Sequence, residues 1–231
     1  DLADLTEGIR ELLDPQGVFV FETGYLVDLI QQGLVDNIYH EHLGYFSVGP
    51  LNRFLRAQGL ELIHVERMGT KGGSLRGMAQ LLGAARAVSP SVGRLIALER
   101  ELELDRPEPF RRLADALGST KATLLCLLRD LKARGKTMAG YGASVGVTTL
   151  MHYFELGELL DFLVDDNPAK HHTLSPNYRI PVLPPAALYE RRPDALVILA
   201  WRYAEPIIAK HHAYLQQGGR VIVPLPDVQV R

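Results

Sequence analysis

The segment Tyr39-His40-Glu41-His42 places two imidazoles, a carboxylate and a phenol at four consecutive positions. An imidazole has an unperturbed pKa of about 6.5, so it can accept or donate a proton near neutral pH. Burying four polar side chains of this kind in a hydrophobic core would be costly unless each found hydrogen-bond partners. At a functional site, the same side chains could transfer protons. The sequence therefore predicts that this segment forms part of a functional site with a general base.

A glycine-rich turn forms a second candidate site. Gly140, Gly142 and Gly146 lie between a predicted strand and a helix over 147–154, and such a turn directs backbone N–H groups at a phosphate. Asp165 and Asp166 end the next strand, at the distance expected of a ribose-binding acid. The third glycine is one position late for a dinucleotide pattern, so a plain strand-to-helix turn and a NAD-binding turn remain open alternatives.

The glycine turn itself contains no basic side chain, so a bound anion would depend on N–H groups and the helix dipole. Lys170 and Arg202, on neighbouring turns, could add positive charge. Trp201 follows a predicted strand and could stack on a base, and packing against the next helix is the alternative. Arg76 is a candidate phosphate or sugar contact, with a surface ion pair as the alternative.

Composition and charge exclude several classes of protein. The 231 residues carry a formal net charge of −2, with no cluster of Lys and Arg for a nucleic acid. The sequence contains no apolar run of about 18 residues, so we predict no membrane span. No signal peptide is recognisable, so we expect a cytoplasmic protein. The single cysteine, Cys126, excludes an intrachain disulfide, and its leucine neighbours predict that it is buried. The sequence does not indicate an oligomeric state.

The order of the predicted elements indicates an α/β fold in three parts. Residues 1–85 read as helix, strand, two helices and a hairpin, in which the apolar run 18–21 predicts a strand buried on both faces. Residues 86–135 are helical by pattern and predict a connector. Residues 136–231 alternate strands and helices, including one helix over 204–217, which predicts a small Rossmann-like parallel layer.

Five segments, in this order, resemble the SAM-dependent sugar C-methyltransferases: Asp36-Asn37-Ile38-Tyr39-His40-Glu41-His42-Leu43-Gly44-Tyr45-Phe46-Ser47, Gly72-Gly73-Ser74-Leu75-Arg76, Gly140-Tyr141-Gly142-Ala143-Ser144, Val164-Asp165-Asp166-Asn167-Pro168-Ala169-Lys170 and Leu199-Ala200-Trp201. The resemblance covers nearly the whole chain. It implies that residues 1–85 are the C-terminal half of a class I methyltransferase-like domain and residues 136–231 a Rossmann-like substrate-binding domain.

The same resemblance implies a function, with antibiotic or surface-polysaccharide biosynthesis as its setting. These enzymes methylate carbon atoms of nucleotide-linked 4-keto-deoxysugars through an enolate. The family's zinc-binding domain and its main S-adenosylmethionine site precede the matched segments, so we expect both outside this chain. A non-catalytic nucleotide-sugar-binding module and an NAD(P)-dependent oxidoreductase are the alternatives.

The resemblance also assigns roles to individual residues. His42 is the expected base, Tyr39 the expected hydrogen-bond donor to the enolate oxygen, and Glu41 a residue that orients an imidazole or binds a sugar hydroxyl, while His40 is expected to be structural. The expected substrate contacts are Arg76, Gly140, Tyr141, Gly142, Ala143, Ser144, Asp166, Asn167, Lys170, Trp201 and Arg202.

Two departures from the family pattern concern substrate identity. Gly146 and Thr148 replace a common lysine and asparagine, and Pro176-Asn177 replaces a Pro-Gly turn. A metal site on His40 and His42 would require both rings on one face of an extended segment and further ligands, so we predict no metal here.

Overall fold

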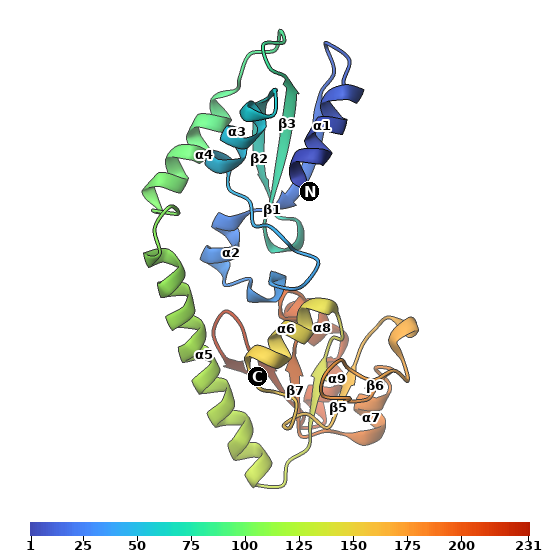
Figure 1. Ribbon diagram of the computed structural model, residues 1–231. Coiled ribbons are helices and arrows are strands. Elements are labelled where there is room, and N and C mark those ends of the chain that lie inside the picture. The colour runs from blue at the N-terminus through green and yellow to red at the C-terminus, as the bar shows by residue number, and fades with distance from the viewer. The chain divides into compact units, whose positions relative to one another are not determined.

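The computed structural model describes residues 1–231 and divides into two compact units. Unit 1 comprises residues 1–34 and 42–113, and unit 2 comprises residues 35–41 and 114–231. The short segment 35–41 therefore packs with residues far away in the sequence. Figure 1 shows the elements of each unit along the colour gradient.

Unit 1 is built on a three-stranded antiparallel sheet with the order β1-β3-β2. Its core gathers apolar side chains of the helices and of β2 and β3, among them Tyr25, Leu55, Leu62 and Leu75. The elements of unit 1 are α1 (Leu2–Leu12), β1 (Phe19–Gly24), α2 (Leu26–Gln32), α3 (Val48–Ala57), β2 (Leu60–Met68), η2 (Thr70–Gly72), β3 (Ser74–Leu81) and α4 (Pro90–Glu101).

The prediction that the run 18–21 is buried on both faces is wrong. Side chains along β1 alternate between half-buried and exposed, and Val20 is 53% exposed. The reason is that only one face of β1 packs on the core: Phe19 and Phe21 contact the core cluster, and Val20, between them, lies on the other face. An apolar run by itself does not say how many faces are covered.

A buried carboxylate holds unit 1 together. Glu99 of α4 accepts hydrogen bonds from the Tyr25 hydroxyl at 2.9 Å, the Gly49 N–H at 2.8 Å and the Val48 N–H. Val48 and Gly49 open α3, so the carboxylate faces the N–H groups of the first turn. Burial and the adjacent Glu99 raise the pKa of Tyr25 above its usual range, so this phenol stays a donor.

The long helix α5 (Glu108–Ala133) occupies most of the predicted connector, whereas α4 packs on β2 and α3. Cys126 of α5 is exposed, so the prediction that it is buried is wrong. Its neighbours Leu124, Leu125 and Leu128 take the buried positions, and a helix turns the residue between them outward. None of the helices is both long enough and apolar enough for a membrane span.

Unit 2 is built on a six-stranded sheet with the order β6-β5-β4-β7-β8-β9. All neighbouring strands are parallel except β8 and β9. Strands β4 and β7 are buried along their whole length, as in sheets covered on both faces. The predicted α/β fold class is therefore confirmed.

The elements of unit 2 beyond α5 are η1 (Val35–Asn37), β4 (Met138–Tyr141), α6 (Val145–Tyr153), β5 (Phe162–Val164), η3 (Pro168–Lys170), β6 (Val182–Leu183), α7 (Ala187–Arg191), β7 (Ala195–Ile198), η4 (Trp201–Tyr203), α8 (Ala204–Lys210), α9 (His212–Gln216), β8 (Arg220–Val223) and β9 (Gln229–Val230). The helix predicted over 204–217 is interrupted at His211, whose backbone is not helical. The His211 ring is buried and hydrogen-bonded to Tyr141 and Tyr189.

Candidate functional site

The glycine turn follows β4 and leads into α6, as the sequence predicts. Its two first glycines have different physical roles. A Cβ on Gly140 would lie 2.6 Å from the Leu163 side chain, so this position is small because the strand packs tightly. Gly142 has a φ of +113°, and a Cβ there would lie 3.0 Å from Ala200. The turn at Gly142 therefore requires glycine on conformational grounds.

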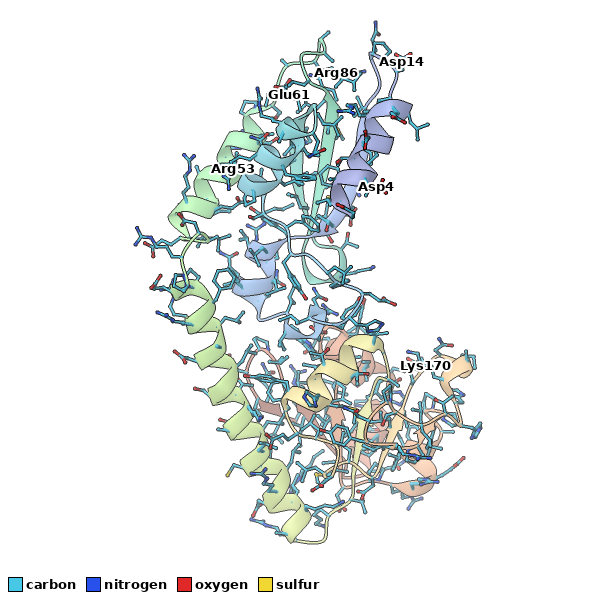
Figure 2. All side chains as sticks on the ribbon, viewed as in Figure 1. Asp4, Asp14, Arg53, Glu61, Arg86 and Lys170 are labelled. Atoms are coloured by element: carbon cyan, nitrogen blue, oxygen red, sulfur yellow. The ribbon has the colours of Figure 1, made fainter.

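Asp165 fixes the glycine turn from the end of β5. Its carboxylate accepts the Ala143 N–H at 2.7 Å, the Asn167 N–H at 2.8 Å and the Lys170 ammonium at 3.2 Å. Lys170, labelled in Figure 2, lies on η3 beyond the carboxyl end of β5. The Ala143 N–H is thus bonded to Asp165 and the Gly142 N–H to the Val164 carbonyl. In the first turn of α6, the Val147 N–H donates to the Ser144 carbonyl at 3.1 Å.

Asp166 takes part in a chain of hydrogen bonds that runs into the core of unit 2. The Tyr141 hydroxyl donates to Asp166 at 2.9 Å and lies 3.0 Å from His211 Nε2, while the Tyr189 hydroxyl lies 3.1 Å from Nδ1. Burial raises the pKa of Asp166, but hydrogen bonds from Lys210 and Tyr141 outweigh this and lower it overall. Burial and the nearby Lys210 charge lower the pKa of His211.

These contacts dictate proton positions. The Tyr141 hydroxyl has one hydrogen, which it gives to Asp166, so His211 donates to the Tyr141 oxygen through Nε2. Burial lowers the pKa of His211, and the neutral ring that this favours accepts the Tyr189 proton at Nδ1. The acid expected to bind a ribose is held by Tyr141 and Lys210 from within the protein.

The Tyr-His-Glu-His segment forms a turn rather than an extended strand. Tyr39 is half-buried, whereas His40, Glu41 and His42 are exposed. His40 Nε2 lies 4.0 Å from Glu41 Oε1, and this pair is 79% and 65% exposed. The chain passes from unit 2 to unit 1 between Glu41 and His42. Covalent geometry keeps the His42 Cα within about 11 Å of the Tyr39 Cα, because three peptide units separate them.

A pocket of about 580 Å³ in unit 2 brings the two predicted site segments together. This volume lies within the range of small-molecule sites. The pocket is lined by residues of the Tyr-His-Glu-His segment, the glycine turn, α6 and the turn 176–177: Ile38, Tyr39, His40, Ala143, Ser144, Val145, Thr148, Thr149, His152, Pro176 and Asn177. A smaller pocket of about 80 Å³ shares Ala143, Ser144, Thr148 and Pro176 with it and reaches Lys170.

Several of these residues escaped the sequence-based prediction. Thr148, Thr149 and His152 lie on one face of α6 at helical spacing, and they are polar positions in an otherwise apolar helix. Polar side chains in an apolar helix directly after a glycine turn were the sequence signal that could have predicted this part of the pocket. His40 lines the pocket and is exposed, so the expectation that it is structural finds no buried contact to support it.

The turn at Asn177 explains one departure from the family pattern. Asn177 has a φ of +68°, in the left-handed region that favours glycine and, after glycine, asparagine. Asparagine can therefore keep the turn that a Pro-Gly pair forms, and it adds an amide that lines the pocket.

The larger pocket is lined by uncharged side chains and by two histidines, His40 and His152. None of its lining residues is Asp, Glu, Lys or Arg. Ser144 is the N-cap of α6, and its side chain makes no capping hydrogen bond, so its hydroxyl is not committed to the helix. A negatively charged ligand group in this pocket would lie near the N-terminal end of α6, where the helix dipole is positive. Lys170 lines the adjoining smaller pocket.

Three predicted contacts from outside these pockets have partners in the protein. Arg76 of β3 pairs with Glu22, directly across from it on β1, at 3.0 Å. Arg202 forms a 2.9 Å ion pair with Asp36, and its guanidinium carbon lies 5.9 Å from the centre of the Trp201 ring. The structure also contains no group of three or more His, Cys, Asp and Glu side chains arranged to hold a metal ion. The substrate roles of Arg76, Trp201 and Arg202 stay predictions.

Comparison with known proteins places this geometry in a family. Residues 69–226 match the family model described as the C-methyltransferase C-terminal domain. The chain is also 35% identical, over all 231 residues, to the C-methyltransferase NovU of Streptomyces niveus. It spans 55% of the length of that relative. The chain therefore belongs to the C-methyltransferase family.

Proposed function

We propose that this chain binds a nucleotide-linked keto-deoxysugar and forms its enolate, as part of a SAM-dependent C-methyltransferase. The single observation that carries the proposal is the shared pocket: Tyr39 and His40 of the proton-transfer segment line it together with Ala143 and Ser144 of the glycine turn. Chemistry on a sugar attached to a diphosphate needs both kinds of group close together. NovU is itself named a C-methyltransferase, which supports carbon as the methylated atom.

The nucleotide part suits the α6 end of the pocket. The N-terminus of α6 and the Ser144 hydroxyl offer hydrogen-bond donors to a diphosphate. Lys170, which pairs with Asp165, also lines the adjoining small pocket and adds positive charge there. Thr148, Thr149 and Asn177 offer neutral polar groups to a sugar or a base. Arg76 pairs with Glu22 on unit 1, so we assign it no part in phosphate binding.

The reaction assigned to this chain is removal of the proton on the carbon next to the carbonyl. His42 takes this proton, the C–H electron pair forms the carbon–carbon double bond, and the carbonyl oxygen becomes the enolate oxygen. A well-placed general base typically contributes about 10²–10⁴ in rate. The Tyr39 hydroxyl donates to the enolate oxygen, and one such donor is worth roughly 3 kcal/mol. Glu41 is assigned to orient an imidazole or to bind a sugar hydroxyl.

S-adenosylmethionine supplies an electrophilic methyl group when it is bound. The glycine turn of unit 2 does not fit that cofactor or a dinucleotide, because Asp165 already accepts the Ala143 N–H and Tyr141 and Lys210 already hold Asp166. We therefore assign no contact of the methyl donor to this turn. The same engagement of Asp166 disfavours an NAD(P)-dependent oxidoreductase.

Exchange of the α-proton tests the proposal without a methyl donor. The 231-residue chain is incubated in D₂O with thymidine- or uridine-diphosphate-linked 4-keto-6-deoxyhexose, and deuterium at the α-carbon is followed by NMR. We expect exchange above the buffer rate. His42→Asn should abolish it while calorimetry still detects binding of the nucleotide-sugar, and His212→Asn, which changes an exposed histidine of α9, should leave it unchanged.

Other outcomes identify other functions. Unchanged exchange in His42→Asn would remove His42 from the mechanism. Binding of the nucleotide-sugar by a chain that catalyses no exchange favours a non-catalytic binding module, a reading that the confinement of all pocket residues to unit 2 supports. Absence of nucleotide-sugar binding contradicts both proposals.

A further inference from the structure

Asp36 is a buried carboxylate three residues before Tyr39. Its side chain is 7% exposed and forms a 2.9 Å ion pair with Arg202 Nη2. The second Arg202 nitrogen, Nη1, lies 3.2 Å from Asn37 Oδ1. Burial raises the pKa of Asp36, and the Arg202 guanidinium lowers it in part. A buried carboxylate of this kind depends on its cation, because water cannot replace it.

The backbone beside Asp36 is held as well. The Thr149 hydroxyl of α6 donates to the Ile38 carbonyl at 2.7 Å. A Cβ on Gly146 would lie 2.5 Å from the Asp36 carbonyl oxygen, so α6 and the segment 35–41 approach more closely than any other residue at 146 allows. Two elements of unit 2, η4 and α6, therefore contact the three residues that precede Tyr39 and hold them in place.

We propose that Asp36 and Arg202 are positioning residues, which dock the segment 35–41 on unit 2 and thereby fix Tyr39 in the pocket. This inference rests on the proposed function and extends it to residues that touch no reacting atom. The ion pair anchors one end of the segment, Gly146 sets its distance from α6, and Tyr39 lines the pocket beyond them.

Trp201 provides a spectroscopic report on this contact. It is the only tryptophan of the chain, and the Arg202 guanidinium carbon lies 5.9 Å from its ring centre, within cation–π range. Its indole N–H is buried beside Asp36 and, as a donor toward that carboxylate, acts to lower the pKa of Asp36 against the larger effect of burial. Emission from Trp201 should therefore change when the Asp36–Arg202 pair is broken.

The test compares Arg202→Met and Gly146→Ala with the unaltered chain. The control is Arg134→Met, which breaks an exposed ion pair with Asp130 at the C-terminal end of α5. We expect both test variants to lower α-proton exchange at least tenfold, since small misplacement of a catalytic group is costly. The affinity of Arg202→Met for thymidine diphosphate should change less than threefold. Amide hydrogen exchange of residues 36–41 should become faster, and Trp201 emission should shift in Arg202→Met.

Rescue separates positioning from loss of folding. Asp36→Asn and the reciprocal double variant Asp36→Arg with Arg202→Asp replace Arg202→Met if that variant does not fold. The double variant should recover part of the amide protection that Asp36→Arg alone loses. The inference would be overturned if the variants kept α-proton exchange and amide protection within twofold of the unaltered chain. It would also be overturned if the loss of α-proton exchange were matched by an equal loss of nucleotide affinity. If the unaltered chain exchanges no α-proton, the proposed function fails while the amide-exchange data still decide whether the pair docks the segment.

Discussion

Truncation of Glu99 should destabilise unit 1 more than any surface substitution. The side chain is 6% exposed, and it accepts hydrogen bonds from Tyr25, Val48 and Gly49. Glu99→Ala leaves three buried donors without an acceptor, at roughly 1–3 kcal/mol each. It also removes a negative charge from the N-terminus of α3, worth about 0.3–2 kcal/mol. Because water can enter the emptied space, we expect the lower part of the summed range, about 3–5 kcal/mol.

Two further variants refine this value. Glu99→Gln retains one acceptor oxygen but turns an amide toward at least one donor, so we expect a loss of about 1–3 kcal/mol. Tyr25→Phe removes one donor together with its hydrogen bond and should cost less than either change at Glu99. Glu101→Ala, at an exposed position on the same helix, is the matched control and should fall within about 0.5 kcal/mol of the unaltered chain.

Urea unfolding followed by circular dichroism measures these differences. Trp201 fluorescence, recorded in parallel, reports unit 2, because unit 1 contains no tryptophan. We expect Glu99→Ala to move the dichroism transition to lower urea. A value for Glu99→Ala within 1 kcal/mol of that for Glu101→Ala would refute the reasoning, since it would mean that the three donors find other acceptors or that the carboxylate is not buried.

Three other predictions follow from the described contacts. Gly142→Ala should destabilise unit 2 by about 1–3 kcal/mol and weaken thymidine diphosphate binding in calorimetry, because the backbone at φ +113° is strained for alanine. The melting temperature should fall as pH drops below about 6.5, because unfolded His211 takes up a proton that the folded imidazole, with its lowered pKa, resists; His211→Gln should flatten this part of the pH profile. Cys126 should react with Ellman's reagent in native buffer, one thiol per chain, and Cys126→Ser should change stability by less than about 0.5 kcal/mol.

Local patterns predicted most of the elements. The strand before the glycine turn, the helix after it and the hairpin of β2 and β3 all follow from short-range periodicity and turn residues, which act within a few positions of the chain. Errors arose where burial depended on distant partners. Only one face of β1 packs on the core, and the helix over 204–217 is interrupted where the His211 ring meets Tyr141 and Tyr189. A pattern within one segment contains no information about such partners.

By itself, the sequence determined the α/β class, the family and the two segments of chemical interest, because these depend on residue types and spacing along the chain. Only the tertiary structure decided that residues 35–41 pack with residues 114–231 in one unit. It also decided that Tyr39 shares a pocket with Ser144. It also showed that Arg202 is paired with Asp36 and that Asp166 is held by Tyr141. Those pairings join residues between 25 and 166 positions apart, and chain folding rather than local preference sets such distances.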